Sequence, residues 1–309
     1  MKALPSRIGG VLRVIRFTNS LTAAVATFLG GLLAVDLGIA FRSPSAWELT
    51  PSSGKLSRSL TAADPEALRS MLLASSCVFF AAAFGYALND YYDVRSDEIN
   101  RLSRPIPSGQ MSKHMAVLVA LVCLGLALVL ALQLPPMTQP LAILSLSLVW
   151  LYSLRVKRLP VAGNVLVALL AALTLIFGGL AVGRPGPVLF PALLAFFVHL
   201  PREILKDVQD LPGDLSTGGR SIAGVVGPRT VARLAAALCV GLAGLGFVPY
   251  ALGLYSRLYL PGIIVVDFIL LWTAATVWNS TSEERVRFAV RLLKLAMLCG
   301  LVTIAAGSV

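Results

Sequence analysis

The chain has 309 residues, of which 57% are hydrophobic and 13% are charged. Soluble domains carry about 25% charged residues, so this composition excludes an ordinary soluble domain. The formal net charge of +11 needs no nucleic-acid partner, because the membrane topology described below accounts for much of it. The sequence therefore predicts an all-α, polytopic membrane protein.

Nine apolar segments are long enough to cross a bilayer as helices. In chain order they are residues 17–40, 68–89, 114–134, 138–154, 161–182, 187–205, 228–252, 259–278 and 288–307. The opening stretch "MKALPSRIGGVLRVIRFTNS" lacks the cleavage site of a secretory signal peptide and leads into a full-length span. We expect a single domain over residues 1–309, built as two pseudo-repeated halves, about 1–135 and 136–309.

Basic residues are distributed unevenly between the two sides of this predicted bundle. With a cytoplasmic N-terminus, 20 of the 26 Lys and Arg residues fall on the cytoplasmic side. The other six are Arg42, Lys55, Arg58, Arg69, Arg184 and Arg257. This asymmetry follows the positive-inside rule. It predicts a cell-membrane protein with both acidic segments described below in the cytoplasm and the loop of residues 41–67 on the other side.

Neither the cysteines nor the histidines have the spacing of a metal site. Each cysteine lies in a different apolar segment, which indicates packing; they are Cys77, Cys123, Cys239 and Cys299. His114 lies among loop charges, and we expect His199 to be hydrogen-bonded inside the bundle.

Two acidic segments each follow an apolar span, and both read D-x2-D-x3-D, 117 residues apart. The aspartates are Asp90, Asp93 and Asp97 in the first segment and Asp207, Asp210 and Asp214 in the second. Four spans separate the segments, so both face the same side. Because helix positions three and four apart share a face, each set can form a row of carboxylates at a helix end. Pro212 and Gly213 predict that the second helix ends early and leaves Asp214 on a loop.

Carboxylates in two clusters suit Mg²⁺, which proteins hold through one or two carboxylates plus substrate phosphates. The alternative is that both clusters are solvated loop ends, but their identical spacing on one side favours a shared site. Basic side chains on the same side suit a diphosphate; they are Arg101, Arg104, Lys113, Lys157, Arg158, Lys206 and Arg220.

These segments resemble the motifs of the UbiA superfamily of intramembrane prenyltransferases. "NDYYDVRSD" fits its first motif, N-D-x2-D-x3-D, "DVQDLPGD" fits its second, and "YSLRVKRLPVAGN", residues 152–164, resembles a third segment. The resemblance implies nine helices around a central cavity, Mg²⁺ (two ions) and a polyprenyl diphosphate substrate.

The resemblance also implies roles for individual residues. In the first motif, Mg²⁺-diphosphate would be bound by Asn89, Asp90, Asp93 and Asp97. In the second, Asp207, Asp210 and Asp214 would hold a second ion or activate the acceptor. Asn19 and Tyr152 would line the substrate site, although an interhelical hydrogen bond explains Asn19 equally well.

Within the superfamily, "DEINRLSRPIPSG" and "REILKDVQDLPGD" most resemble the archaeal enzymes that add a second geranylgeranyl chain to geranylgeranylglyceryl phosphate. Leu102 departs from the proline of many members, and Arg220-Ser221 departs from a frequent Lys-Thr. The resemblance implies Mg²⁺-dependent transfer of a geranylgeranyl group to this lipid acceptor, with formation of an ether bond.

Other functions are open at this point. An aromatic acceptor such as 4-hydroxybenzoate, a quinol precursor or a tetrapyrrole is the main alternative. A cation transporter would carry its ionisable residues near mid-membrane, whereas here they cluster at one face. A CDP-alcohol phosphotransferase would need glycine where Val94 follows Asp93, and a soluble isoprenyl diphosphate synthase would be less apolar. The substrates and membrane lipids are the only partners that we expect; no protein partner is implied.

Overall fold

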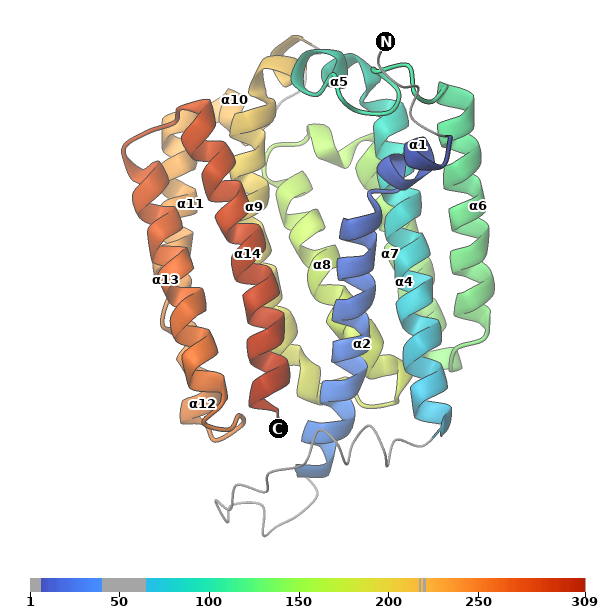
Figure 1. Ribbon diagram of the computed structural model, residues 1–309, viewed down its shortest axis with the longest axis vertical. Helices are drawn as coiled ribbons and strands as arrows, with labels where there is room; N and C mark the ends of the chain where they lie inside the picture. The colour runs from blue at the N-terminus through green and yellow to red at the C-terminus, as the bar shows by residue number, and fades with distance from the viewer. Residues whose placement is uncertain (1–6, 41–64, 217, 219–220, 309) are drawn as a thin grey trace.

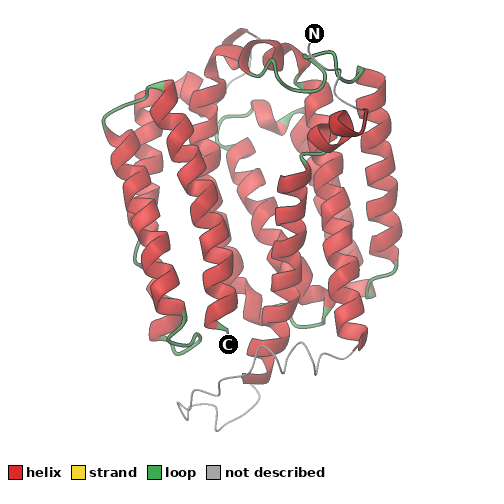
Figure 2. Cartoon of the chain, in the orientation of Figure 1, coloured by secondary structure: helices red, strands yellow, loops and turns green. Residues whose placement is uncertain are grey.

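The computed structural model describes residues 7–40, 65–216, 218 and 221–308. Every regular element in these residues is a helix (Figure 2), which confirms the predicted all-α class. Most of the loop predicted at residues 41–67 lies outside the described residues, as do Arg220 and the side chain of Arg158.

Within the described residues, nine segments are long and apolar enough to cross a membrane, as predicted. They run alternately up and down, with α1 (Arg7–Val14) at the upper end in Figure 1 and the end of α14 at the lower end. The long helices are α2 (Phe17–Ala40), α4 (Pro65–Tyr92), α6 (Lys113–Leu132), α7 (Gln139–Leu154), α8 (Ala162–Ala181), α9 (Leu189–Ser216), α11 (Pro228–Leu242), α13 (Tyr259–Trp278) and α14 (Glu283–Gly307).

Short helices close both ends of the bundle. The α-helical ones are α1 (Arg7–Val14), α5 (Val94–Asn100), α10 (Ile222–Val226) and α12 (Val248–Ala251). The 3₁₀ turns are η1 (Pro136–Thr138), η2 (Val156–Arg158), η3 (Gly186–Val188) and η4 (Leu245–Phe247). Helices α1, α5 and α10 lie at the upper end (Figure 1), where the two acidic segments also lie.

The predicted seventh span, residues 228–252, is interrupted. Helix α11 ends at Leu242, and the chain turns at Gly244, whose φ of 91° is available to glycine without a steric penalty. The freed backbone N–H of Gly244 donates to the Asp267 carboxylate of α13 at 3.0 Å. The Asp267 side chain therefore supplies a hydrogen-bond acceptor for the backbone N–H that the interruption leaves free. The span is completed by η4 and α12.

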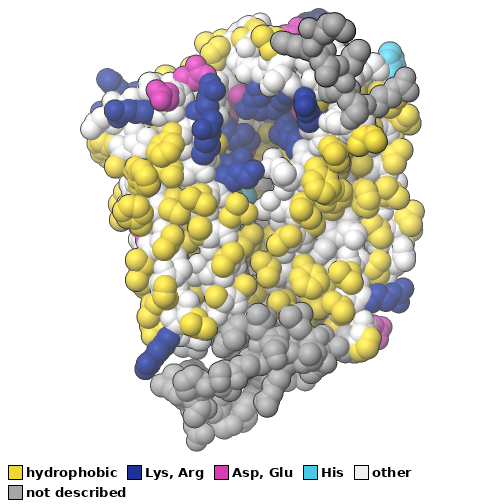
Figure 3. Space-filling model, in the orientation of Figure 1, with side chains coloured by type: hydrophobic (Ala, Val, Ile, Leu, Met, Phe, Trp, Pro, Cys, Tyr) yellow, Lys and Arg dark blue, Asp and Glu magenta, His cyan; other side chains and the backbone are white. Residues whose placement is uncertain are grey.

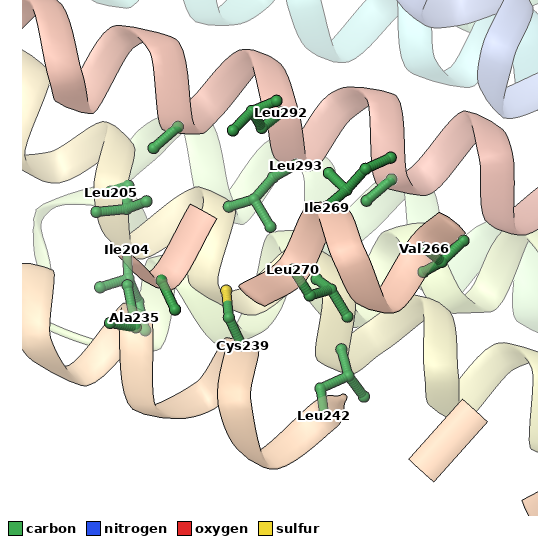
Figure 4. Close-up of a cluster of buried hydrophobic side chains, with 14 of the residues drawn as sticks. Ile204, Leu205, Ala235, Cys239, Leu242, Val266, Ile269, Leu270, Leu292 and Leu293 are labelled. Atoms are coloured by element: carbon green, nitrogen blue, oxygen red, sulfur yellow. The ribbon is translucent and has the colours of Figure 1, made fainter. Parts of the chain in front are cut away.

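Buried side chains form two main clusters. One joins α9, α11, α13 and α14, and Figure 4 shows Leu205, Cys239, Leu270 and Leu293 pointing toward one another within it. The other joins α4, α6, α7 and α8. Three of the four cysteines are buried and all are free thiols, as expected for packing residues.

Helices α2 and α8 approach each other backbone to backbone. A Cβ atom at Gly178 would collide with the carbonyl oxygen of Thr27, and one at Gly30 would collide with that of Leu175. Small residues at such interfaces allow membrane helices to pack closely. Large apolar side chains instead cover the outside of the bundle, such as Leu132, Phe268 and Val302, which are 72%, 62% and 68% exposed. Exposure on this scale suits a lipid environment.

A cavity of about 690 Å³ lies between the helices. Its wall comes from α2, α4, α7, α8, α9, α13 and α14. Figure 3 shows Lys and Arg side chains gathered around a hollow near the upper end, with hydrophobic side chains covering the middle of the same face. The fold thus joins a charged end to an apolar interior.

Candidate active site

The first acidic segment is divided between two helices. Asn89 and Asp90 occupy the last turn of α4, Asp93 lies at the junction, and Asp97 lies on α5. Helical hydrogen bonds nevertheless continue across the junction, from Asp93 N to Asn89 O at 2.9 Å and from Asp97 N to Asp93 O at 2.8 Å. The chain therefore changes direction without separating the three carboxylates.

Two arginines neutralise Asp90 and Asp97, the two buried carboxylates of this segment. Arg16 Nη2 lies 2.9 Å from Asp90 Oδ1, and Arg104 Nη1 lies 3.1 Å from the same oxygen. Arg104 also pairs with Asp97. The backbone of Arg16 is in the left-handed region, with φ of 45°, a conformation that costs a non-glycine residue free energy and often marks a functional position.

Asp93 has a different cation. Lys157 Nζ, from η2, lies 2.5 Å from Asp93 Oδ1 and donates to Asn89 Oδ1 at 3.3 Å. The third predicted segment, "YSLRVKRLPVAGN", therefore contacts the first motif directly.

Burial raises the pKa of Asp97 to about 6; the Arg104 guanidinium opposes this rise, and the nearby Asp93 carboxylate adds to it. A cation that approached Asp97 would favour the ionised carboxylate. With a pKa of about 6, the Asp97 carboxyl is already mostly ionised near pH 7, and a bound cation would lower this pKa further.

The second acidic segment lies on one continuous helix. Helix α9 runs through Pro212 to Ser216, so the expectation that it ends before Asp214 is wrong. A side chain of α5 supports the helix where proline weakens it, because Asn100 Oδ1 accepts a hydrogen bond from Gly213 N at 3.0 Å. Asp207, Asp210 and Asp214 therefore all project from α9.

The two segments are bonded to each other. Arg101 Nη2 lies 2.6 Å from both carboxylate oxygens of Asp210, and Asn100 Nδ2 donates to the Asp210 carbonyl at 2.8 Å. The Asp214 carboxylate is repelled by those of Asp210 and Asp93. The two motifs thus face each other across one site. This agrees with the prediction that both lie on the same side of the membrane.

Asp207 is held by the start of the next helix. Its Oδ2 accepts a hydrogen bond from the backbone N–H of Ile222, in α10, at 3.3 Å. One turn earlier on α9, Glu203 binds two cations, Arg202 at 2.7 Å and Lys206 at 2.6 Å. Lys206, predicted to bind substrate, is thus already paired in this structure.

The cavity wall contains most of the predicted substrate residues that the structure describes. They are Asn19, Asn89, Arg101, Arg104, Tyr152 and Lys206. Lys157 lies at the first motif, as described above. Lys113 is exposed at the start of α6 and does not line the cavity, so the structure does not bring it to the site.

Sequence reasoning missed three cations of the cavity wall: Arg16, Arg202 and Lys294. Lys294 gave a usable signal, because a lysine inside an otherwise apolar span is a functional candidate by default. His199 also lines the cavity, and its Nδ1 is hydrogen-bonded to the Ala195 carbonyl at 2.8 Å, as expected.

The chemistry of the aspartates fits Mg²⁺, although no three His, Cys, Asp or Glu side chains in the described residues converge as a ready-made metal cluster. Their oxygens are hard donors, and Mg²⁺ commonly takes only one or two carboxylates together with substrate phosphates. The Arg and Lys partners supply the counter-charge in this structure.

Comparison with known proteins places the chain in a family. The UbiA prenyltransferase family matches residues 57–298. The chain belongs to this family. It is therefore a membrane-embedded prenyltransferase, and the cation-transporter alternative is wrong.

Individual proteins that are similar to this chain support its assignment to the UbiA prenyltransferase family. The chain is 35% identical to the digeranylgeranylglyceryl phosphate synthase of Methanopyrus kandleri over 234 residues, 74% of this chain and 84% of that protein. A solved structure of a digeranylgeranylglyceryl phosphate synthase is 26% identical, with a TM-score of 0.70 over 98% of this chain and 99% of that one. A UbiA homologue from Archaeoglobus fulgidus, solved with DMAPP and Mg²⁺, is 20% identical, with a TM-score of 0.56 over 96% and 99% of the two chains.

Proposed function

We propose that this prenyltransferase transfers a geranylgeranyl group from its diphosphate to the hydroxyl group of geranylgeranylglyceryl phosphate and forms an ether bond. One observation carries the proposal: a single cavity has a mainly apolar interior, and at its charged end it is lined by Asn89, Arg101 and Arg104, which adjoin or pair with the two aspartate motifs. The identity of the acceptor is supported by the M. kandleri relative and by the solved synthase.

The aspartates would hold Mg²⁺ with the prenyl diphosphate. Asn89, Asp90, Asp93 and Asp97 would serve one ion, and Asp207, Asp210 and Asp214 a second. When bound, Mg²⁺ would neutralise the diphosphate and stabilise the negative charge that develops as the C1–O bond breaks. The A. fulgidus homologue, which binds Mg²⁺ with DMAPP, supports the use of this metal.

Cations that pair with the motif aspartates would also bind the diphosphate leaving group. Arg101, Arg104 and Lys157 pair with aspartates here, and a bound metal would compete for those carboxylates. Each cation released would be available to a diphosphate oxygen at nearly the same position. Arg158 and Arg220 remain predictions for the same role.

The interior of the cavity would protect the reacting carbon. Below the charged end its wall is mainly apolar, with residues such as Leu170, Leu194, Leu270 and Leu301. Such a wall holds the prenyl tail and excludes the water that would otherwise capture the allylic cation. The acceptor oxygen then attacks C1, the electron pair of the broken bond leaves with diphosphate, and the hydroxyl proton is released.

The test uses purified protein in detergent with geranylgeranyl diphosphate and Mg²⁺. Three acceptors are compared: geranylgeranylglyceryl phosphate, its dephosphorylated form and 4-hydroxybenzoate. We expect diphosphate release and ether product with the first, and a lower kcat/KM with the other two. Preference for 4-hydroxybenzoate would establish the aromatic alternative and contradict the proposed acceptor.

We further propose that the upper end of the bundle faces the cytoplasm of the cell membrane, on the basis of the distribution of basic residues. Single cysteines at Ser96 and Ser216, in a Cys-free variant, should resist impermeant thiol reagents in intact cells, whereas one at Ser53 should react. Labelling at Ser96 or Ser216 but not at Ser53 would reverse the orientation.

A further inference from the structure

The cations of the cavity fall into two groups. Those beside the aspartate motifs are paired with carboxylates, as in Arg101–Asp210, Arg104–Asp90 and Lys206–Glu203. The second group lies where α2, α4, α9 and α14 meet, and it has fewer acidic partners among the described residues. We call this group the Asn19 cluster: Asn19, Tyr86, Arg202 and Lys294, all of which line the cavity.

Lys294 has a neutral partner. Its Nζ donates to Asn19 Oδ1 at 3.0 Å, and no salt bridge to Lys294 occurs within the described part of the chain. An ammonium group has three N–H donors, so one amide oxygen leaves hydrogen-bonding capacity at this position. A charged donor without a carboxylate partner in a membrane cavity suits an anionic ligand.

Arg202 also has unused capacity. Its Nη1 binds Glu203, but Glu203 is shared with Lys206, so one carboxylate serves two cations. Arg202 Nε is buried without a hydrogen-bond partner. Burial of an unsatisfied donor is unfavourable, so the guanidinium keeps hydrogen-bonding capacity that a ligand could use once the side chain turns toward the cavity that it lines.

Tyr86 brings the members together. Its side chain interacts with that of Asn19 and electrostatically with Arg202 and Arg16. Arg16 also lies over the Tyr86 ring, with Cζ 4.7 Å from the ring centroid. Since Arg16 is itself bonded to Asp90, it forms the link between the Asn19 cluster and the first aspartate motif.

We propose that the Asn19 cluster binds the phosphate monoester of the lipid acceptor, at a subsite distinct from the diphosphate site. A phosphate monoester carries about −1.5 to −2 charges at pH 7. Lys294 has no carboxylate partner among the described residues, and Arg202 shares Glu203 with Lys206, so the cluster keeps positive charge for such a group. The several oxygens of a phosphate can bind both an ammonium and a guanidinium group. The proposal rests on the proposed function and specifies which side chains recognise the acceptor.

The position of the cluster suits an acceptor rather than the prenyl donor. Asn19 and Lys294 belong to α2 and α14, which carry no motif carboxylate, while Tyr86 and Arg202 stand about one turn before Asp90 on α4 and before Asp207 on α9. Two anionic groups held at separate cation clusters in one cavity avoid direct repulsion. The link through Arg16 keeps them near enough for the acceptor hydroxyl to approach C1.

The test compares Lys294→Gln and Arg202→Gln with the wild type at saturating geranylgeranyl diphosphate. The matched control is Arg291→Gln, which removes an exposed cation one turn earlier on α14. We expect Lys294→Gln and Arg202→Gln to lower kcat/KM for geranylgeranylglyceryl phosphate at least about tenfold, as for loss of a charge-assisted hydrogen bond. With the dephosphorylated acceptor, kcat/KM should change less than about twofold, because the missing contact is to the phosphate. The KM for geranylgeranyl diphosphate should not change, and Lys294→Arg should restore most of the loss.

Four outcomes would overturn the proposal. Equal losses with both acceptors would mean that the cluster has a structural role. A raised KM for geranylgeranyl diphosphate would place the diphosphate there. Retention by both variants of the wild-type preference for the phosphorylated acceptor would reject the subsite alone, whereas a wild type that does not use this acceptor would reject the proposed function as well.

Discussion

The two aspartate motifs have the same spacing, but they are built differently. The first is divided at Asp93 between α4 and α5, whereas the second lies on the unbroken α9. Among the described residues, the first motif makes four ion pairs and the second makes one, between Asp210 and Arg101.

The difference shows that spacing does not determine how a carboxylate is used. The change of direction at Asp93 accompanies its pairing with Lys157, while Asp90 and Asp97 share Arg104. On α9 the second row is instead supported by backbone contacts, such as the one from Ile222 to Asp207. We infer that metal and substrate binding would rearrange the ion pairs of the first motif more than those of the second.

The largest effect is expected at the carboxylates. Asp93→Ala and Asp210→Ala should each lower turnover by about a hundredfold to a thousandfold or more, because charge stabilisation of the leaving group would be lost. Diphosphate release in the presence of Mg²⁺ measures this loss, and removal of Mg²⁺ with EDTA should abolish turnover. Glu98→Ala, an exposed acid next to Asp97 on α5, is the control and should retain activity. Normal turnover after either aspartate substitution would show that its motif has no catalytic role.

A smaller effect is expected where the motifs are joined. Arg101→Gln removes the ion pair to Asp210 and should lower kcat/KM by roughly tenfold to a hundredfold, which corresponds to about 1.5–3 kcal/mol for a charge-assisted hydrogen bond. Arg95→Gln, exposed on α5, the helix that ends just before Arg101, provides the comparison. If both variants behave alike, the contact between the motifs does not contribute to catalysis.

The smallest effect is expected at Gly213, where α9 and α5 touch. A Cβ atom there would collide with Asn100 Nδ2, so Gly213→Ala should force the helices apart. Overpacking of this kind typically costs about 1–3 kcal/mol of stability, with a smaller loss of turnover than in the variants above. Thermal unfolding in detergent measures the cost.

Asn100→Ala provides the test of this explanation for Gly213. In the double variant the amide, which is the nearest colliding group, is absent, and only Ser96 Oγ, 2.7 Å from the same Cβ, remains. The double variant should therefore lose less stability than the sum of the two single losses. If the double variant loses the full sum of the two single losses of stability, Gly213 of α9 and Asn100 of α5 are not in contact as described.

Much of the fold was predictable because lipid requires long apolar helices, and all nine spans appear near the expected positions. Local interruptions were less predictable. Pro212 suggested a helix end, but the contact between Asn100 and Gly213, which are far apart in the sequence, sustains α9. Gly244 gave no comparable signal within its apolar segment. The pseudo-repeat of two halves remains a prediction.

The site was partly predictable for a similar reason. The motifs and Lys157 lie close to the ends of apolar spans, where charged residues are easily recognised in the sequence. Arg202 and Lys294 lie within or next to apolar segments, and only the packing of α9 and α14 shows that both line the cavity. Lys113 has the expected charge and side of the membrane, but its helix points it outward.

The backbone contact between α2 and α8 has a consequence for how the protein is made. Helix α2 is synthesised before α8, so Gly30 and Gly178 cannot meet until the fifth span has entered the membrane. The hydrogen bond between Asn19 and Lys294 joins the first and ninth spans and forms later still. During biosynthesis the first aspartate motif is therefore in place well before the cavity wall is complete, and the Asn19 cluster is assembled only when the ninth span inserts.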